Sequence, residues 1–219
     1  MRESMEKWRQ EHVESPNYLP DRTRIPDERS EMGLAQRFTH LCGNVVQYVP
    51  AWGWMVWDGK VWQRNAISLA RLQCMSYLDE MLSEAFSKAT LNPEDPAVLE
   101  TLKWARNTRN ARTLRSVMEL AQPRMTSDDT LFDVDPWLLN TQGGLVDLKT
   151  GEVRPHDSRA YCTMICDADP TKDCEGRRWR QFLKDVTCND TELESYLQTL
   201  FGMAAVGKIY QEGVAIFYG

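Results

Sequence analysis

The sequence predicts an α+β fold in which helices dominate and small β-hairpin or meander elements accompany a helical bundle. Three observations carry this prediction. Apolar residues recur at helical spacing over 66–89 and again over 97–122. Two turns alternate with two short apolar segments between 135 and 152, which is typical of a compact β-meander. No stretch approaches the length of about 18 apolar residues that a membrane-spanning helix needs.

The first 31 residues are predicted to form a flexible charged arm. They hold six basic and eight acidic residues, together with Pro16, Pro20 and Pro26. They also lack the apolar core of a signal peptide, so we expect a cytoplasmic protein without a membrane partner. A short helix is expected over 32–42, where apolar residues precede Gly43.

Short strands are predicted over 45–49, 54–57 and 60–63, with Asp58 and Gly59 as the turn of a hairpin. This region is rich in tryptophan. An exposed tryptophan can stack on a nucleic-acid base. Packing between strands explains the same residues without a ligand, and we favour it for Trp54, Trp57 and Trp62.

The helical patterns at 66–89 and 97–122 predict a helical hairpin or small bundle. The second helix carries a basic residue at every third position, with Asn107, Thr108, Asn110 and Thr113 between them as hydrogen-bonding groups. Residues 97–124 include six basic and only two acidic residues, whereas the whole chain has a net charge of −6 and a pI of about 5.2. The repeating residues are Lys103, Arg106, Arg109, Arg112 and Arg115.

Two interpretations of this basic helix stay open. A three-residue period on an α-helix drifts around the axis, so the charges form a spiral that can follow a phosphate backbone. Alternatively, the helix presents a solvated face whose cations pair with Asp79, Glu80 and Glu84 of the preceding helix. The first interpretation predicts that charge reversal of Arg109 and Arg112 abolishes salt-sensitive DNA binding.

After the meander, a strand is expected over 160–166, and helices are expected over 176–186 and 191–205. No catalytic or metal site is predicted. The three histidines lie far apart, and the six cysteines lack metal-ligand spacing, so free thiols are expected. Four aspartates are interpreted as turn residues rather than metal ligands: Asp133, Asp135, Asp147 and Asp157.

The last six residues, 214–219, form an apolar run that ends in Gly219. By its pattern alone this run is typical of an ordinary core strand. A strand of this kind can also lead into a phosphate-binding loop, of which Gly219 would be the first glycine, and the family resemblance given below favours that interpretation. The lysine and the hydroxyl residue that reach phosphate and magnesium do not follow, so no cofactor is expected in this chain and it is not expected to hydrolyse ATP by itself.

Several segments together resemble the poxvirus-type primase-helicases of phages and plasmids. The meander resembles that family's Asp-Pro, Val-Asp-Leu and Thr-Gly-Glu series, and 52–62 resembles its tryptophan-rich hairpin. Cys174, Trp179, Phe182 and Leu183 stand where the family begins a helix. The likeness extends over 32–219.

The resemblance implies four parts: the arm at 1–31, an accessory domain at 32–170, a helical segment at 171–213 and the first strand of an AAA+ motor at 214–219. It implies single-stranded or forked DNA as the partner, and it favours contact of the five basic residues with that DNA. For the longer protein it implies replication with other proteins, ATP and magnesium, and a hexameric superfamily-three ring. Two alternatives remain: a scaffold that oligomerises or recruits partners without DNA contact, and a stand-alone regulator without a motor.

Overall fold

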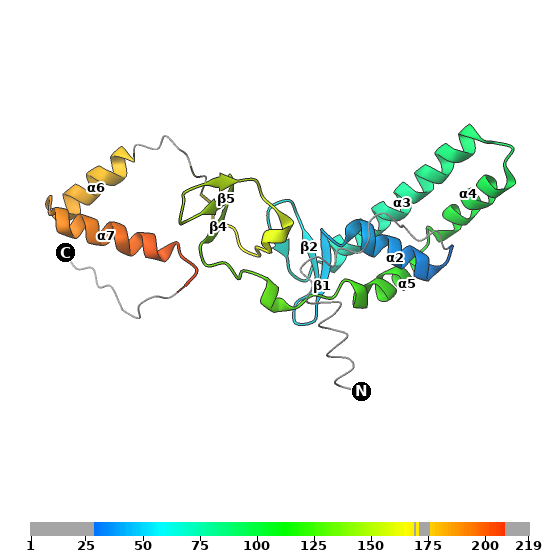
Figure 1. The fold of residues 1–219 in the computed structure, drawn as a ribbon, viewed down its shortest axis with the longest axis horizontal. Coiled ribbons are helices and arrows are strands. Elements are labelled where there is room, and N and C mark those ends of the chain that lie inside the picture. The colour runs from blue at the N-terminus through cyan, green and yellow to red at the C-terminus, as the bar shows by residue number, and fades with distance from the viewer. Residues whose placement is uncertain (1–28, 169, 171–175, 209–219) are drawn as a thin grey trace, which may run out of the picture. The chain divides into compact units, whose positions relative to one another are not determined.

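The computed structural model describes residues 29–168, 170 and 176–208. Helices dominate it, and the strands are short and antiparallel, so the predicted α+β class is confirmed (Figure 1). Nearly all of the predicted arm, Cys174 and the terminal run 214–219 lie outside the described residues. The chain divides into two compact units, one built from 29–49 and 66–126 and the other from 50–65 and 127–208.

The first unit begins with helix α2 (Glu31–Cys42), which agrees with the predicted short helix. Ser30 caps it, because its hydroxyl oxygen accepts from the amide of Gly33 at 3.0 Å. Leu34, Ala35 and Phe38 lie on the buried face of the helix. Strand β1 (Val46–Val49) follows, and the amide of Tyr48 donates to the carbonyl of Met125 at 2.8 Å.

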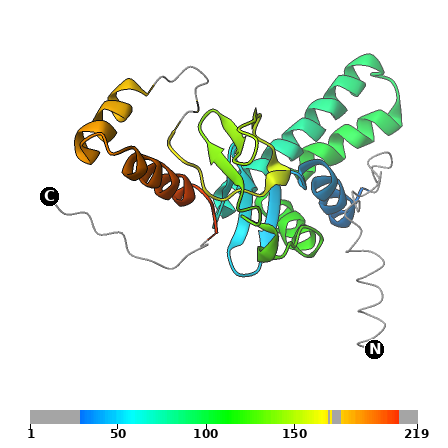
Figure 2. The same ribbon diagram turned by 60° about the vertical axis from the view of Figure 1, so that its left-hand side comes forward.

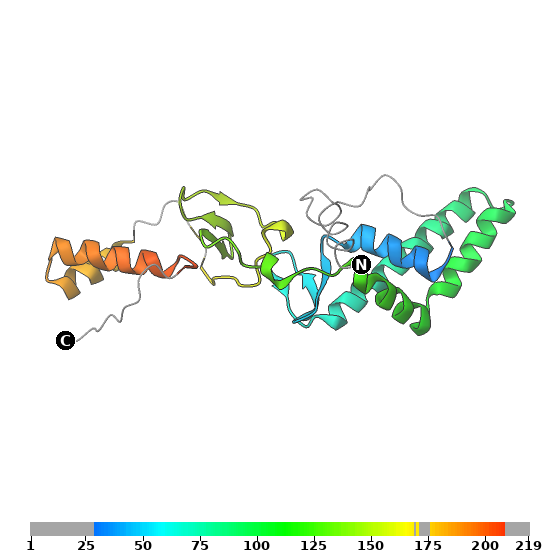
Figure 3. The same ribbon diagram turned by 60° about the horizontal axis from the view of Figure 1, so that its bottom comes forward.

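Helices α3 (Ile67–Leu91) and α4 (Pro96–Thr108) form a hairpin and lie side by side in every view (Figures 1, 2 and 3). Asp95 caps α4, and Pro96 occupies its first turn, where a missing amide costs nothing. The buried residues of the hairpin include small ones, namely Ala85 and Ala89 of α3 and Ala105 of α4. Small buried side chains allow neighbouring helices to approach closely.

The predicted single helix over 97–122 is wrong. It is two helices, α4 and α5 (Ala111–Ala121), separated at Arg109 and Asn110. Asn110 is extended, and its side-chain oxygen accepts from the amides of Arg112 and Thr113, both at 2.9 Å. An asparagine in this role starts a new helix, because it satisfies amides that the break leaves without carbonyl partners.

Helix α5 and the following turn η1 (Gln122–Arg124) complete the first unit. Helix α5 packs against α2 and α3. Its contribution to the core is Val117, Met118 and Ala121, of which Val117 and Ala121 are fully buried. The 3.6-residue spacing of these apolar positions is therefore used as the sequence predicts, although the helix is shorter.

In the second unit, strands β2 (Gly53–Trp57) and β3 (Trp62–Gln63) pair antiparallel with Trp57 opposite Trp62. Strand β3 is shorter than predicted, because the amides of Lys60 and Val61 are bound by the Asp58 carboxylate in the turn. Trp62 is almost fully buried, and its ring stacks on Tyr161 at a centroid distance of 6.1 Å.

The predicted meander is confirmed. Strands β4 (Leu138–Thr141), β5 (Gly144–Asp147) and β6 (Val153–Arg154) form an antiparallel sheet in that order. Gly144 has φ of +144°, and a Cβ there would lie 2.5 Å from the carbonyl oxygen of Arg154. Only glycine fits this turn, because a side chain would push β6 away.

The strand predicted over 160–166 does not form. Two 3-10 turns, η2 (Asp129–Leu131) and η3 (Ser158–Ala160), are followed directly by Phe132 and Tyr161, whose rings contact that of Trp62. Cys166 makes only an isolated bridge to Thr141. Tyr161 adopts a left-handed conformation with φ of +50°, which interrupts an extended backbone.

Helices α6 (Arg177–Thr187) and α7 (Thr191–Ala204) form a second hairpin, close to the predicted ranges. Asp190 caps α7, because its carboxylate accepts from the amides of Glu192 and Leu193. The hairpin has two buried leucines, Leu183 on α6 and Leu197 on α7.

Candidate nucleic-acid interface

The five basic residues predicted to bind DNA lie on two helices and the link between them. Lys103 and Arg106 are on α4, Arg109 follows its last residue, and Arg112 and Arg115 are on α5. All five side chains are exposed. Because the chain turns at Asn110, the continuous spiral of charge predicted for one helix does not exist. Two short cationic faces take its place.

Arg109 is occupied by an ion pair within the hairpin. Its Nε lies 2.6 Å from Oδ1 of Asp79 on α3, and about half of each side chain is exposed. This is the pairing that the solvated-face interpretation expects for Asp79. An ion pair with this exposure contributes about 0–1 kcal/mol, so it positions Arg109 more than it stabilises the fold. Glu80 and Glu84 form no ion pair with the basic set among the described residues.

The remaining four cations have no carboxylate partner within the described ranges. The Nε of Arg115 donates to the backbone carbonyl of Ala111 at 3.2 Å, which fixes its stem along α5. Lys103 and Arg106 are one turn apart on α4 and therefore project from neighbouring positions. These four side chains carry positive charge that no described carboxylate neutralises.

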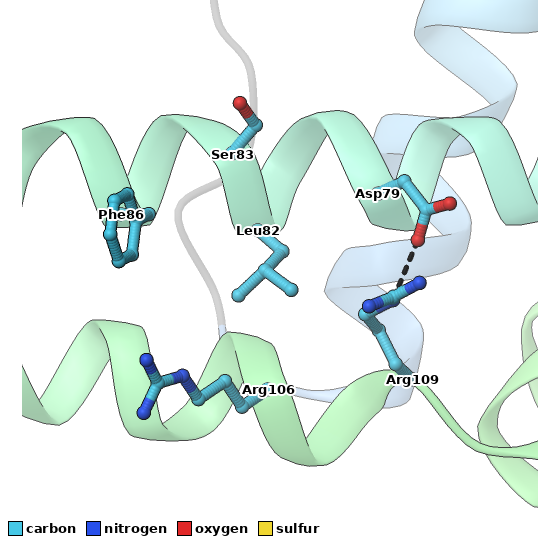
Figure 4. A pocket seen from close by; sticks show the side chains of 6 residues that line it. All are labelled: Asp79, Leu82, Ser83, Phe86, Arg106 and Arg109. Carbon is cyan, nitrogen blue, oxygen red and sulfur yellow. Dashed lines mark ion pairs between the residues drawn. The ribbon is translucent and has the colours of Figure 1, made fainter.

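A groove runs between α3 and α4, and two residues of the basic set line it (Figure 4). Its volume is about 390 Å³, and α4 contributes Arg106 and Arg109 to it. From α3 come Asp79, Leu82, Ser83 and Phe86. The Arg109–Asp79 pair lies at one end, and Phe86 lies at the other end, toward which the Arg106 guanidinium extends. The groove thus combines an aromatic ring, an apolar floor and a cation.

The polar residues predicted to assist DNA binding are mostly used inside the fold. The hydroxyl of Thr108 donates to the carbonyl of Ala105, and the side chain of Thr108 is buried. Asn110 caps α5 and also donates to the Thr113 hydroxyl at 3.0 Å, where Thr113 is itself buried. The prediction for these three residues is therefore wrong. Asn107 alone is exposed without such a role.

The tryptophans of the hairpin pack, as favoured from the sequence. Trp54 and Trp62 are buried, and the indole nitrogen of Trp62 donates to the carbonyl of Ser158 at 2.7 Å. The Arg64 guanidinium lies over the ring of Trp52 at 3.8 Å. A buried indole cannot stack on a base, so neither Trp54 nor Trp62 belongs to the interface.

Three of the four aspartates bind the backbone amide two residues further on, as predicted for turn residues: Asp135 accepts from Trp137, Asp147 from Lys149 and Asp157 from Arg159. For Asp133 the prediction is wrong, because its carboxylate accepts from the amide of Thr163, 30 residues away, at 2.8 Å. Hydrogen bonds from the Arg159 side chain and backbone lower the pKa of Asp157. His156 is within 2.8 Å of the Thr141 carbonyl. No group of three or more potential metal ligands occurs in the part of the chain that the structure describes.

One partial phosphate-loop pattern was missed by the sequence reasoning and does not fit a nucleotide. Gly202, Gly207 and Lys208 have the spacing of such a loop, but Ile209 stands in place of the Ser or Thr. Gly202 lies inside α7, where a phosphate loop would follow a strand. The amide of Gly207 donates to the carbonyl of Pro136 at 2.9 Å. No step of ATP chemistry is assigned to these residues, and Gly219 lies outside the described ranges.

Comparison with known proteins gives one family. Residues 35–188, more than half of the chain, match the family described as D5 N terminal like. No curated protein matches the chain. Within the described residues, no helix is both long and apolar enough to cross a membrane. The matched range includes every residue of the basic set and of the α3–α4 groove.

Proposed function

The chain belongs to the D5 N-terminal-like family of primase-helicase N-terminal regions, and we propose that its α3–α5 region engages DNA for such an enzyme. The observation that carries the proposal is the set of four exposed cations without carboxylate partners among the described residues: Lys103, Arg106, Arg112 and Arg115. Cations of this kind bind phosphates with the release of counterions, and the binding weakens as salt rises.

The likeness to phage and plasmid primase-helicases extends this proposal to the longer protein. There the region would help to assemble a hexameric ring of the superfamily-three type at a replication fork, together with replication proteins. Unwinding would depend on ATP and magnesium in an AAA+ motor. Within this chain the proposed work is binding and positioning of single-stranded or forked DNA.

The test compares two variants of the whole chain that remove equal charge. The triple variant Lys103→Gln, Arg112→Gln, Arg115→Gln removes cations at the proposed interface. The control, Arg178→Gln, Arg180→Gln, Lys184→Gln, removes three exposed cations from α6. Fluorescence anisotropy of labelled oligothymidylate and forked DNA is measured from about 50 to about 200 mM salt.

The interface variant should bind far more weakly, and the slope of log K against log salt should fall by about 0.7 for each lost contact to a single strand. The control should keep most of its affinity. Equal losses in both variants would show that only overall charge matters and would contradict the proposed interface. Arg109 is left intact in this design, since replacing it with glutamine would also remove the ion-pair partner of Asp79.

A second candidate function, assembly with protein, is favoured by the α6–α7 hairpin. The hairpin buries little beyond Leu183 and Leu197. Large apolar side chains on it are between 41% and 60% exposed: Trp179, Phe182, Val186, Leu193, Tyr196 and Phe201. The ring of Trp179 contacts those of Phe182 and Phe201, and exposed apolar surface of this kind marks protein interfaces. The test is concentration-dependent sedimentation of the wild type and of Phe182→Ser; identical behaviour of the two would remove this candidate.

A further inference from the structure

We propose that the α3–α4 groove holds an unpaired base of single-stranded nucleic acid, stacked on Phe86, with the flanking phosphate on Arg106. This inference rests on the proposed DNA-engaging function and adds to it a subsite for one base and one phosphate. The argument starts from Phe86, which lies on α3 and is 56% exposed at one end of the groove.

Phe86 does not serve the helical core. Its neighbour Ala85 is only 4% exposed and is the residue that turns toward the packed side of α3. The ring of Phe86 lies instead at the rim of the groove, on the helix opposite Arg106 (Figure 4). A phenyl ring with this much exposure to solvent offers a surface for stacking, and every base has a π-face that can stack on it.

The two ends of the groove differ in charge. Arg109 is held by Asp79 at 2.6 Å at one end, so its charge is already balanced. Arg106 at the other end has no carboxylate partner among the described residues, and Lys103 lies one turn away on the same helix. An anion is therefore favoured at the Phe86 end and opposed near Asp79. A nucleotide, with a flat apolar base and a charged phosphate, matches this arrangement.

Single strands fit better than duplex DNA because the bases of a duplex are stacked on each other and face away from solvent. Reaching Phe86 requires a base that is free to leave its neighbours. Leu82 and Ser83 lie between the two ends of the groove, and at about 390 Å³ the groove has room for a base. A peptide with aromatic and acidic side chains has related chemistry, and the test separates it from a nucleic acid.

The experiment uses two oligonucleotides of about 12 nucleotides, within the span that such sites cover. One is oligothymidylate, and the other carries the same phosphates on abasic sugars. The full chain is compared with Phe86→Ala, Phe86→Leu, Phe86→Trp and Arg106→Gln by anisotropy at fixed salt. The matched control is Leu91→Ala, since Leu91 is 79% exposed on the same helix but outside the groove.

We expect Phe86→Ala and Phe86→Leu to weaken binding of oligothymidylate by roughly 5- to 100-fold and to leave binding of the abasic strand unchanged. Phe86→Trp should restore binding, because stacking needs a ring. Arg106→Gln should weaken both probes, and Leu91→Ala should weaken neither. Thermal unfolding of each variant, compared with the wild type, establishes that the hairpin is intact.

Two results would overturn the inference while leaving DNA engagement in place. One is an unchanged affinity of Phe86→Ala for oligothymidylate, and the other is an equal loss on both probes. If the wild type binds neither probe in a salt-dependent way, the proposed function itself fails. Binding of an acidic, phenylalanine-containing peptide in place of oligothymidylate would assign the groove to a protein partner. That result would overturn both this inference and the proposed DNA-engaging function.

Discussion

Asn110 determines where the basic segment bends. Its side-chain oxygen accepts from two amides of α5, and its side-chain nitrogen donates to the carbonyl of Asn107 at 2.7 Å. Replacing Asn110 with alanine removes these bonds, and we expect the free energy of unfolding to fall by about 0.5–2 kcal/mol. Urea denaturation measures the change. Asn110→Asp should recover most of it, and Asn107→Ala should have little effect, so equal losses in Asn107→Ala and Asn110→Ala would contradict the capping role.

Buried thiols give a second prediction at the scale of single residues. Burial raises the pKa of Cys74 to about 12 and that of Cys162 to about 11. At pH 8 a thiol with a pKa near 11 is ionised on the order of one part in a thousand, and the thiolate is the reactive form. Peptide mapping after brief iodoacetamide treatment should therefore find Cys166 and Cys188, which are exposed, modified well before Cys74 and Cys162. Early modification of Cys74 would contradict its burial.

The hairpin turn between β2 and β3 gives a prediction at the scale of an element. Burial alone would raise the pKa of Asp58, but hydrogen bonds from Val61, Gln63 and Lys60 outweigh it and lower the pKa. A lowered pKa in the folded state means that the carboxylate stabilises the turn above about pH 4 and loses this effect as the pH falls through the folded pKa. Asp58→Asn should thus be less stable than wild type at pH 7, with a smaller difference near pH 3.

Chemical denaturation at the two pH values measures this difference. Asp167→Asn serves as the control, because Asp167 is an exposed carboxylate in the same unit. A difference between wild type and Asp58→Asn that stays constant from pH 7 to pH 3 would show that the lost bonds do not depend on the charge of Asp58.

Elements were predictable from the sequence where local pattern and tertiary packing agree. The meander follows from its turn residues, and the helical spacing of 66–89 gives α3. The break at Asn110 was not visible, because an asparagine inside a helical pattern costs only tenths of a kcal/mol and good helix formers flank it. The strand expected over 160–166 fails for a tertiary reason: Tyr161 turns left-handed where its ring stacks on Trp62.

The candidate site was predictable only in part. The repeating cations pointed to α4 and α5, and the pairing of Asp79 with a cation of the next helix was foreseen as an alternative. Phe86 is one of the apolar residues whose helical spacing predicts the helix over 66–89. That Ala85 is buried while Phe86 stays exposed depends on how the helices of this unit pack, which periodicity does not determine.

At the scale of the whole molecule, the net charge of −6 opposes any general attraction to DNA. Binding must therefore come from a local set of cations, whereas assembly through α6 and α7 would come from apolar surface. Salt separates the two, because it screens charge but does not weaken apolar burial.

We therefore expect opposite responses of the wild-type chain between about 50 and about 500 mM salt. Anisotropy should show oligothymidylate binding falling steeply as salt rises. Sedimentation velocity should show self-association through the α6–α7 hairpin persisting in chloride and strengthening in sulfate, which favours apolar burial. Tyr196→Ser, which changes a side chain that is 60% exposed on α7, should reduce the association at every salt concentration and leave oligothymidylate binding intact. If self-association weakens with rising salt as steeply as DNA binding does, charged contacts rather than apolar ones hold the assembly together.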